Sequence, residues 1–483
     1  MTGSVAVPDP GIVSRVTVDG RRFVDVAGRE VILHGINVVC KDPTTGHMYP
    51  DMDTLLPRLA GLGFNFLRLG VFWASVEPAP GNYDNDYIGR VSAVIEQACT
   101  LGLHVLIDLH QDLYGSAVGG EGAPPWATLR GNLPVLPGDT MWYQAYITSP
   151  ALMRAADAFW ADEPAADGVG IQTRYIAMLR HLANRLTPQQ NVIGIEPMNE
   201  PYMGSIARTA FRDATAAATA ADPMFDLSKP DTISPAARSA MSDILNDRFT
   251  AFDRDTLTPF FERAADAIAA SGPALFTGGN IYSSSFIDTA IGRLPEGAQA
   301  YAPHVYDAVT DAASYEGYDP NNLEALAHQK HGTQDLLRLP TVVGEWGAFP
   351  SEPSTPERLR HMFGLIEEYR WGSAYWCYQP GMLDDPEFTP LVRGYPLAIG
   401  GTLRSYHWDY DAHTLTVDWH AEHDTSTVLY VPSLGAVTHL QVAGVPADTV
   451  AIDADSFGSG ALITVTPHAD GPQQISVQAP SRS

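Results

Sequence analysis

The stretch VIGIEPMNE, residues 192–200, is an apolar, β-branched run that ends in polar residues and a glutamate. A short run of this kind predicts a strand that is buried on both faces. Seven further runs share this pattern, and segments with helical periodicity separate most of them. The seven are VILHGIN (31–37), NFLRLG (65–70), HVLIDLHQD (104–112), ALFTGG (274–279), AYAPHVY (300–306), TVVGEW (341–346) and SAYWCY (373–378).

The segments between the runs predict helices, which include 86–101, 171–185, 256–270 and 355–369. Eight buried strands that alternate with helices are the pattern of a (β/α)8 TIM barrel, in which the parallel strands form the inner wall. Before the first run, RVTVDGRRFVDV (15–26) predicts a hairpin, which we expect to plug the floor of the barrel.

The pattern changes after residue 393. Residues 406–480 contain short alternating runs, TLTVDWH, TVLYVP, VTHLQVAG, ALITVTP and QQISVQA, with turn residues between them. Such runs predict an antiparallel β-sandwich. We therefore expect an α/β catalytic barrel with its N-terminal hairpin over residues 1–395, and a C-terminal β-sandwich domain over residues 396–483.

The composition excludes several classes of partner and cofactor. The chain holds 56 Asp and Glu against 29 Lys and Arg, a net charge of −27, and such a surface repels nucleic acid and anionic headgroups. No apolar run reaches the roughly 18 residues of a transmembrane helix. Cys40, Cys99 and Cys377 form no CxxC pair, so we expect no structural zinc. No other cluster of metal ligands is evident in the sequence, so we also expect no other metal and no cofactor.

Reactive side chains of a (β/α)8 enzyme follow the carboxyl ends of its strands. Glu200 ends the fourth run and Glu345 the seventh, so the two should face each other across the barrel mouth. Two carboxyl groups about 5–5.5 Å apart are what a retaining glycosidase needs, and an Asn beside the acid can bind a sugar 2-hydroxyl. The other strand ends carry Asn37, Arg68, His110, Asp112, Asn199, His304, Tyr306, Trp346 and Trp376.

Several of these residues have simpler interpretations. Arg68 could form a structural ion pair, and Trp376 could belong to the barrel core, where aromatic residues usually pack. His110 and Asp112 could be two ligands of a metal site, although no third ligand follows them nearby in the sequence.

Two long connections follow strands, at residues 114–167 and 202–253. Loops of this length in a compact domain usually carry function, and both should rise over the catalytic face. We hypothesise that some of their apolar side chains form a groove beside the active site, the alternative being that they only pack the loops onto the barrel. The candidates are Trp126, Trp142, Tyr143, Phe159, Trp160, Met203, Phe211, Met224 and Phe225.

The strand-end residues together resemble glycoside hydrolase family 5, with Asn-Glu-Pro at 199–201 and His-x-Tyr at 304–306 as the most specific motifs. A narrower resemblance, to the bacterial endoglycoceramidases, spans nearly the whole chain. Those enzymes release the intact oligosaccharide from the ceramide of a glycosphingolipid. The segments that carry this likeness are HGINVVCK (34–41), RLGVFWASVEPAPGNYD (68–84), LIDLHQDLYG (106–115), GAPPWA (122–127) and MNEP (198–201).

The resemblance implies the catalytic roles. Glu200 is expected to be the acid/base and Glu345 the nucleophile. Asn199 should contact the 2-hydroxyl of the sugar in the −1 site. Arg68 should hold Glu345 ionised, and Tyr306 should donate a hydrogen bond to it.

The resemblance also implies a sugar site. His110 and His304 should line it, and Trp376 should form a platform under the sugar ring. Lys41 and Asp112 match the residues with which endoglycoceramidases bind glucose hydroxyls, which favours this interpretation over a cellulase.

The expected activity is therefore a retaining endo-glycosidase that hydrolyses the β-glycosidic bond between oligosaccharide and ceramide. Two alternatives stay open: a family 5 endo-β-glucanase or related polysaccharidase, and a non-catalytic barrel that binds carbohydrate or lipid. We expect a monomer that meets its amphiphilic glycosphingolipid substrate at a membrane or micelle surface. We also expect secretion, although residues 1–15 contain no basic segment followed by a continuous apolar run, as a signal peptide would.

Overall fold

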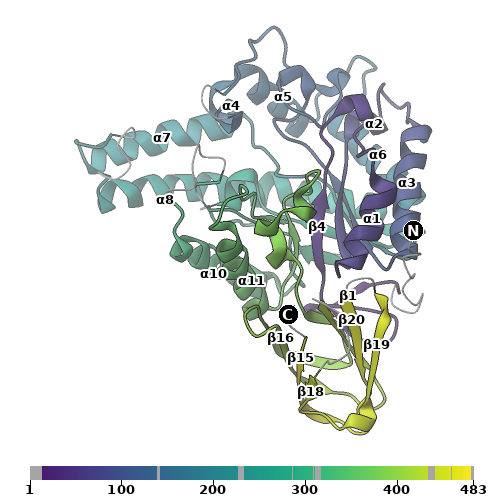
Figure 1. Ribbon diagram of the computed structural model, residues 1–483. Helices are drawn as coiled ribbons and strands as arrows, with labels where there is room; N and C mark the ends of the chain where they lie inside the picture. The colour runs from purple at the N-terminus through teal and green to yellow at the C-terminus, as the bar shows by residue number, and fades with distance from the viewer. Residues whose placement is uncertain are drawn as a thin grey trace.

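The computed structural model describes residues 14–138, 142–226, 233–285, 287–307, 309–310, 317–432, 441–457 and 460–479. Figure 1 shows two parts, a large barrel surrounded by helices and a smaller β-domain below it, coloured yellow-green. Among the described residues, no helix is both long enough and apolar enough to cross a membrane.

Eight parallel strands form the barrel, in the order β11-β13-β4-β5-β6-β7-β8-β9. A bridge between Tyr301 and Thr341 and the parallel pairing of β10 with β12 join the two ends of this sheet. The predicted TIM barrel is thereby confirmed. The eight strands are β4 (His34–Val38), β5 (Phe66–Val71), β6 (His104–Leu109), β7 (Val192–Glu196), β8 (Ala274–Thr277), β9 (Gln299–Tyr301), β11 (Val342–Val343) and β13 (Gly372–Tyr375). The joining pair consists of β10 (His304–Val305) and β12 (Glu345–Trp346).

Three of the predicted strands differ in detail from the structure. The run 31–37 is not one strand, because Val31 belongs to β3 (Glu30–Val31), which pairs with the C-terminal sheet, and the barrel strand begins only at His34. The sixth and seventh runs are each broken in two, between β9 and β10 and between β11 and β12. Pro303 lies at the first break. Because proline has no backbone N–H, it cannot donate the hydrogen bond that would continue the strand.

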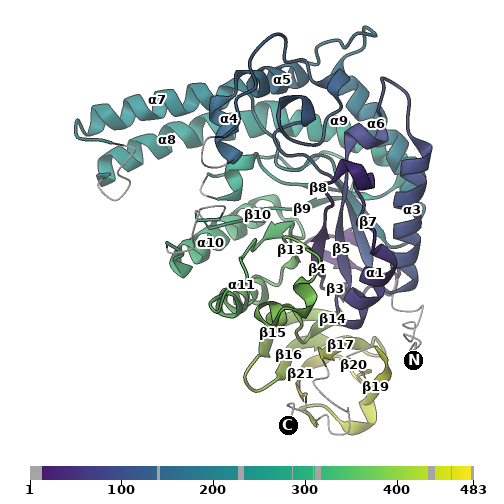
Figure 2. The ribbon, with the colours of Figure 1, turned by 45° about the horizontal axis from the view of Figure 1, so that its top comes forward.

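Helices surround the barrel (Figure 2). The four predicted helices are confirmed, and no end moves by more than two residues. Sequence chemistry fixes some of the starts, since the Asp84 side chain accepts hydrogen bonds from the first amides of α3. The barrel helices are α1 (Met52–Gly61), α3 (Asn85–Thr100), α6 (Ile171–Leu186), α9 (Thr258–Ile268), α10 (Pro320–Leu337) and α11 (Thr355–Tyr369).

One connection breaks the alternation of strands and helices. Between β8 and β9 the described residues contain no α-helix, only the short 3-10 helix η8 (Ile281–Ser284). The two long connections contain α4 (Ala145–Thr148), α5 (Pro150–Trp160), α7 (Ser205–Ala221) and α8 (Pro235–Phe252). Figures 1 and 2 show α7 and α8 side by side as an arm that projects from the barrel.

The N-terminal hairpin, β1 (Thr17–Asp19) and β2 (Arg22–Val24), covers the barrel floor as predicted. Val16 and Phe23 pack in one apolar cluster with inward-facing barrel residues that include Phe66 and Phe276. The Phe23 and Phe276 rings are stacked, with centroids 5.8 Å apart. The hairpin also pairs through β3 with the C-terminal sheet, a link that the sequence pattern did not predict.

The C-terminal part consists of two sheets with an apolar core between them that contains Trp408 and Trp419. The predicted antiparallel β-sandwich is confirmed, although part of the run VTHLQVAG (437–444) lies outside the described residues. The strands are β14 (Tyr395–Ile399), β15 (Gly401–Asp409), β16 (Thr414–Ala421), β17 (Thr427–Pro432), β18 (Gln441–Ala443), β19 (Val450–Phe457), β20 (Gly460–Val465) and β21 (Gly471–Gln478).

Candidate active site

Glu200, Glu345 and His304 meet at the carboxyl ends of the barrel strands. Glu200 follows β7, while Glu345 begins β12 and His304 begins β10, which pairs with β12. His304 Nδ1 lies 2.9 Å from Glu200 Oε1 and 3.5 Å from Glu345 Oε2. One ring nitrogen of His304 and one carboxyl oxygen of each glutamate all lie within 4.8 Å of one another. The two carboxyl groups are therefore as close as a retaining mechanism requires and closer than an inverting mechanism needs.

Arg68 is the cation that organises this centre. Its side chain is fully buried, and it donates to Glu345 Oε1 at 2.7 Å and to both oxygens of Glu196, at 2.7 and 2.9 Å. The contact with Glu345 that we expected is present. Arg68 also forms a buried structural ion pair with Glu196. The residue therefore both contacts Glu345 and belongs to a structural ion pair, as the two interpretations of the sequence proposed.

Two buried carboxylates of the Arg68 network were missed in the sequence. Asp108 on β6 lies 3.1 Å from Arg68 Nη1, and Glu196 ends β7. Burial raises the pKa of Glu196 and the charge of Arg68 opposes that shift. A charged residue inside an apolar strand run, as in LIDL and IGIE, was the available signal, since such a charge needs a buried partner.

Hydroxyl groups donate hydrogen bonds to the carboxyl groups of both Glu345 and Glu200. Tyr306 donates to Glu345 Oε2 at 2.9 Å, as expected, and Ser284 donates to Glu200 Oε1 at 2.8 Å. Burial, and then the charge of Glu345, raise the pKa of Tyr306 well above its usual value, so this phenol stays protonated. Nothing in the sequence pointed to Ser284, which comes from the short η8.

Asn199 is buried and fixed by hydrogen bonds on both sides of its amide. Its Oδ1 accepts from Arg68 at 2.8 Å, and its Nδ2 donates to the Gln111 carbonyl at 3.0 Å. The orientation of the amide is thus set before a substrate arrives. Contact of Asn199 with a sugar 2-hydroxyl stays a prediction.

Lys41 and Asp112 form an ion pair at the edge of the site, and Glu121 lies 3.3 Å from the Lys41 Nζ. Burial alone would lower the pKa of Lys41, but the negative charges of Asp112 and Glu121 raise it above the usual value. Burial opposes the charge of Asp112 as well, yet Lys41 and His110 hold its pKa well below the usual range. The sequence did not single out Glu121, which reaches this position because its backbone pairs with that of Asp112.

Trp376 follows β13 and lies between His110 and Lys41. Its ring is stacked on the His110 ring with centroids 5.2 Å apart, and the Lys41 Nζ lies 5.1 Å from its centroid. His110 itself is buried, with hydrogen bonds to Asp108 at 2.8 Å and Asp112 at 3.2 Å. Burial alone would lower the pKa of His110, but the two carboxylates raise it to about 9.

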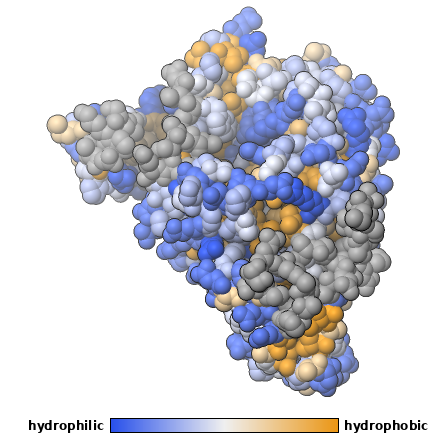
Figure 3. Space-filling model, viewed as in Figure 1, coloured by the Kyte–Doolittle hydropathy of each residue, from blue (hydrophilic) through white to orange (hydrophobic). Residues whose placement is uncertain are grey.

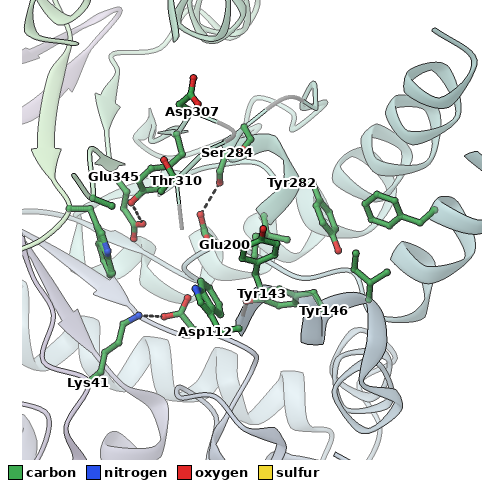
Figure 4. A pocket seen from close by; sticks show the side chains of 18 residues that line it. Lys41, Asp112, Tyr143, Tyr146, Glu200, Tyr282, Ser284, Asp307, Thr310 and Glu345 are labelled. Atoms are coloured by element: carbon green, nitrogen blue, oxygen red, sulfur yellow. Dashed lines mark hydrogen bonds and ion pairs between the residues drawn. The ribbon is translucent and has the colours of Figure 1, made fainter. Parts of the chain in front are cut away.

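A cavity of about 470 Å³ joins these groups to an apolar wall (Figure 4). Lys41, Asp112, Trp376, Glu200 and Glu345 line one end. The other end is lined by side chains of the two long connections and of η8: Trp142, Tyr143, Tyr146, Ile147, Phe211, Ile281 and Tyr282.

The hypothesis of an apolar groove built by the long connections is correct for some of its residues. Trp142, Tyr143 and Phe211 line the cavity. Phe159 and Met203 do not, because both are almost fully buried in the core. Trp126 and Trp160 are partly buried and pack against that core, whereas Met224 is 85% exposed. The cavity lining includes none of these three residues, and it does not include Phe225.

Within the described ranges, Glu200, His304 and Glu345 also form a possible set of metal ligands, a group that the sequence did not suggest. Burial would lower the pKa of His304, but Glu345 and Glu200 raise it. An imidazole that holds its proton donates to the carboxylates and has no lone pair on that nitrogen for a cation. The arrangement therefore suits proton transfer better than metal binding.

Comparisons with known proteins agree with this geometry. A model of the cellulase domain of glycosyl hydrolase family 5 matches residues 24–381, and a model of the glycoside hydrolase family 5 C-terminal domain matches residues 393–478. Endoglycoceramidase I of Rhodococcus hoagii (strain 103S) is 28% identical over 427 residues, which are 83% of this chain and 76% of the relative. An endoglycoceramidase of Cyanea nozakii is 22% identical over 448 residues, 83% of this chain and 80% of that protein.

A solved structure shows the same fold. Endo-glycoceramidase II from Rhodococcus sp., in a ganglioside GM3 complex, superposes with a TM-score of 0.76 at 23% identity, over 96% of this chain and 100% of the other. The family model covers most of the chain, and the two glutamates lie where a two-carboxylate hydrolase needs them. This chain is a glycoside hydrolase that belongs to glycosyl hydrolase family 5.

Proposed function

We propose that this enzyme hydrolyses the β-glycosidic bond between the oligosaccharide and the ceramide of glycosphingolipids, with retention of configuration. The observation that carries the proposal is the cavity, which joins a charged end suited to sugar hydroxyls to an apolar end suited to hydrocarbon. The two catalytic glutamates lie at the charged end and face the apolar wall across the same cavity. A soluble β-glucan would place sugar rings on both sides of the cleaved bond and would gain little from this wall.

The reaction follows from the two carboxyl groups. Glu345 attacks the anomeric carbon while Glu200 donates its proton to the departing ceramide oxygen, which leaves a covalent glycosyl-enzyme. Glu200 then takes a proton from a water molecule as the oxygen of that water attacks the anomeric carbon. The bond from this carbon to Glu345 breaks, which releases the oligosaccharide and frees Glu345. Arg68 and Tyr306 donate hydrogen bonds to Glu345 and hold its carboxyl group in place for the attack.

The sugar end supports a glycosidase that acts on a glucosyl or galactosyl residue. Lys41 and Asp112 present a donor and an acceptor next to the Trp376 ring, an arrangement that matches vicinal hydroxyls above an apolar sugar face. We propose that Asn199 binds the 2-hydroxyl in the same site and that His110 fixes Asp112.

The apolar end supports a lipid substrate met at a surface. Trp142 is 42% exposed and lines the cavity, and Leu133, Val135 and Leu136 from the same connection are also exposed. Figure 3 shows apolar side chains at the end of the molecule where α4 and α5 lie in Figure 1. We propose that this region approaches a membrane or micelle, and that the enzyme works as a secreted monomer. Two relatives of the chain are endoglycoceramidases by name, which agrees with such a substrate.

Incubation with a panel of glycosphingolipids tests the proposal. The expected products are an intact oligosaccharide and free ceramide, identified by mass spectrometry, with activity on a soluble β-glucan much lower. Cleavage of the β-glucan with no release of ceramide would instead identify a family 5 polysaccharidase. Removal of single terminal sugars would contradict the endo mode.

A further inference from the structure

The β8–β9 connection contains a turn that is held unusually firmly for a loop. It consists of η8, which Asn280 caps by accepting a hydrogen bond from the Tyr282 amide. This turn occupies the place of a barrel helix, and its last residue, Ser284, reaches the catalytic centre. Figure 4 shows Ser284 and Glu200 pointing toward each other.

Polar contacts fix the turn from behind. Asp253 is fully buried at the π-helical turn between α8 and α9, and its Oδ1 accepts from Asn280 Nδ2 at 2.9 Å and from Asn280 N at 3.2 Å. Lys330 on α10 is also buried and donates to the Ser283 carbonyl. A buried acid and a buried amine are costly, and they persist where they fix a neighbouring segment.

Aromatic contacts fix the turn from the side. The Tyr282 ring is stacked on Phe249 of α8, with centroids 4.7 Å apart and planes 15° apart. Phe211 of α7 packs against the same ring at 5.4 Å. The base of the projecting arm and the turn are therefore one packed unit.

Ser284 transmits this rigidity to Glu200. It is 8% exposed, its carbonyl accepts from the Tyr306 amide at 3.0 Å, and its hydroxyl donates to Glu200 Oε1 at 2.8 Å. His304 Nδ1 binds the same oxygen. Among the described residues no hydrogen bond to Glu200 Oε2 is present, so the second oxygen is the one left to carry a proton.

We propose that Ser284 is a positioning residue for the acid/base: its hydroxyl holds Glu200 Oε1 so that Oε2 carries the proton that is delivered to the leaving group. This inference rests on the role proposed for Glu200 but not on the ceramide substrate. A donor on Oε1 fixes the orientation of the carboxyl group, so its removal lets the side chain of Glu200 rotate and misplaces the proton on Oε2.

Other groups also face Glu200 and set the background for this effect. His304 contacts it from β10, and Glu345 from β12 adds a like charge nearby. The hydroxyl groups of Tyr306 and Tyr146 lie close enough for the charge of Glu200 to raise the pKa of each, after the larger effect of burial. Replacement of Ser284 leaves all four groups in place.

The test compares Ser284→Ala with wild type on two aryl glycosides of the same sugar, one with a poor and one with an activated leaving group. With the poor leaving group, kcat/KM should fall about tenfold, because departure of this group needs a proton from Glu200. A tenfold loss is the size expected for the loss of one hydrogen bond. With the activated leaving group, kcat/KM should change less than twofold, within about the scatter of such assays.

Two variants serve as controls. Ser284→Thr keeps the hydroxyl and should restore most of the loss, while Ser285→Ala removes a neighbouring hydroxyl that makes no hydrogen bond to Glu200 and should behave as wild type. Equal losses on both aryl glycosides, no recovery in Ser284→Thr, or the same effect in Ser285→Ala would each overturn the proposal. Because no ceramide is used, a failure of the ceramide assignment would not affect this result.

Discussion

The two ends of the cavity are built by different parts of the chain. The charged end comes from barrel strands, where Arg68, Glu196 and Glu345 are fixed by hydrogen bonds of 2.7 to 2.9 Å. The apolar end comes from the long connections and η8, which contribute single side chains from separate segments. In the proposed function, the barrel supplies the chemistry, while the insertions decide what the leaving group can be. Changes at the charged end should therefore affect every substrate, and changes at the apolar end only lipid substrates.

The largest effect is expected from Glu345→Gln, which removes the proposed nucleophile and keeps the shape of the side chain. Turnover should fall by roughly 10⁴-fold or more on every substrate, because the covalent route is lost. Single-turnover and steady-state rates on an aryl glycoside and on a glycosphingolipid measure this.

Azide rescue distinguishes the two glutamates. Glu200→Ala with an activated substrate should recover rate in azide and yield a β-glycosyl azide. An α-azide from this variant, or rescue only when Glu345 is replaced, would reverse the assignment of the two roles.

The next effect concerns the charge of His110, whose folded pKa of about 9 lies above an unfolded value of about 6.5. The stability that His110 contributes is fully present below pH 6.5 and is lost as the pH rises through 9. The contribution is up to about 3 kcal/mol, from 1.36 kcal/mol per pKa unit.

Denaturant unfolding at several pH values measures this contribution. The difference in stability between wild type and His110→Asn should shrink between pH 6.5 and 9. His423→Asn, at an exposed site of the β-domain, should keep the wild-type curve. Parallel curves for wild type and His110→Asn would mean that His110 is neutral in the folded enzyme.

A smaller effect should separate the apolar end from the charged end. Ile147→Ser or Trp142→Ser removes on the order of 60 Å² of apolar contact with a ceramide chain, which at about 25 cal/mol per Å² is about tenfold in kcat/KM. The loss should appear on a glycosylceramide and be nearly absent on an aryl glycoside of the same sugar.

Met224→Ser is the control for these variants, because Met224 is an exposed apolar residue of the other long connection and lies outside the cavity lining. It should behave as wild type on both substrates. Equal losses on both substrates for the cavity variants would show that the wall is only structural.

The smallest effect is expected from removal of metal ions. Two carboxyl groups carry the reaction, so exhaustive chelation should leave activity within about twofold. Activity that disappears with chelator and returns only with a divalent ion would assign a metal to Glu200, His304 and Glu345 after all.

The parts of the site that the sequence predicted are those at strand ends. Glu200, Glu345 and Arg68 follow or lie in buried runs, and the period of the barrel brings such positions to one face. Asp108 and Glu196 were missed because a charge inside an apolar run has meaning only once its partner across the barrel is known. Ser284 could not be predicted, since its position depends on a turn that tertiary contacts hold.

In the fold as well, features that depend on local sequence were predicted, whereas features that depend on tertiary packing were not. Helix 355–369 was predicted to the residue, because its apolar spacing and the Pro at its first turn are local signals. Trp142, Tyr143 and Phe211 could not be separated from Phe159 and Met203 by composition alone, since all five are apolar residues of long connections. Only the packing decides which of them face the cavity.

The pairing of β3 with β14 joins residues near the start of the chain to the β-domain near its end. The hairpin next to β3 covers the barrel floor, and the Glu30 side chain accepts a hydrogen bond from the Leu403 amide at 3.3 Å. A cut between barrel and β-domain would therefore remove the strand partner of β3 from the barrel fragment and the strand partner of β14 from the other fragment. The enzyme should unfold as a single cooperative unit, and its catalytic barrel should be obtainable only together with the β-domain.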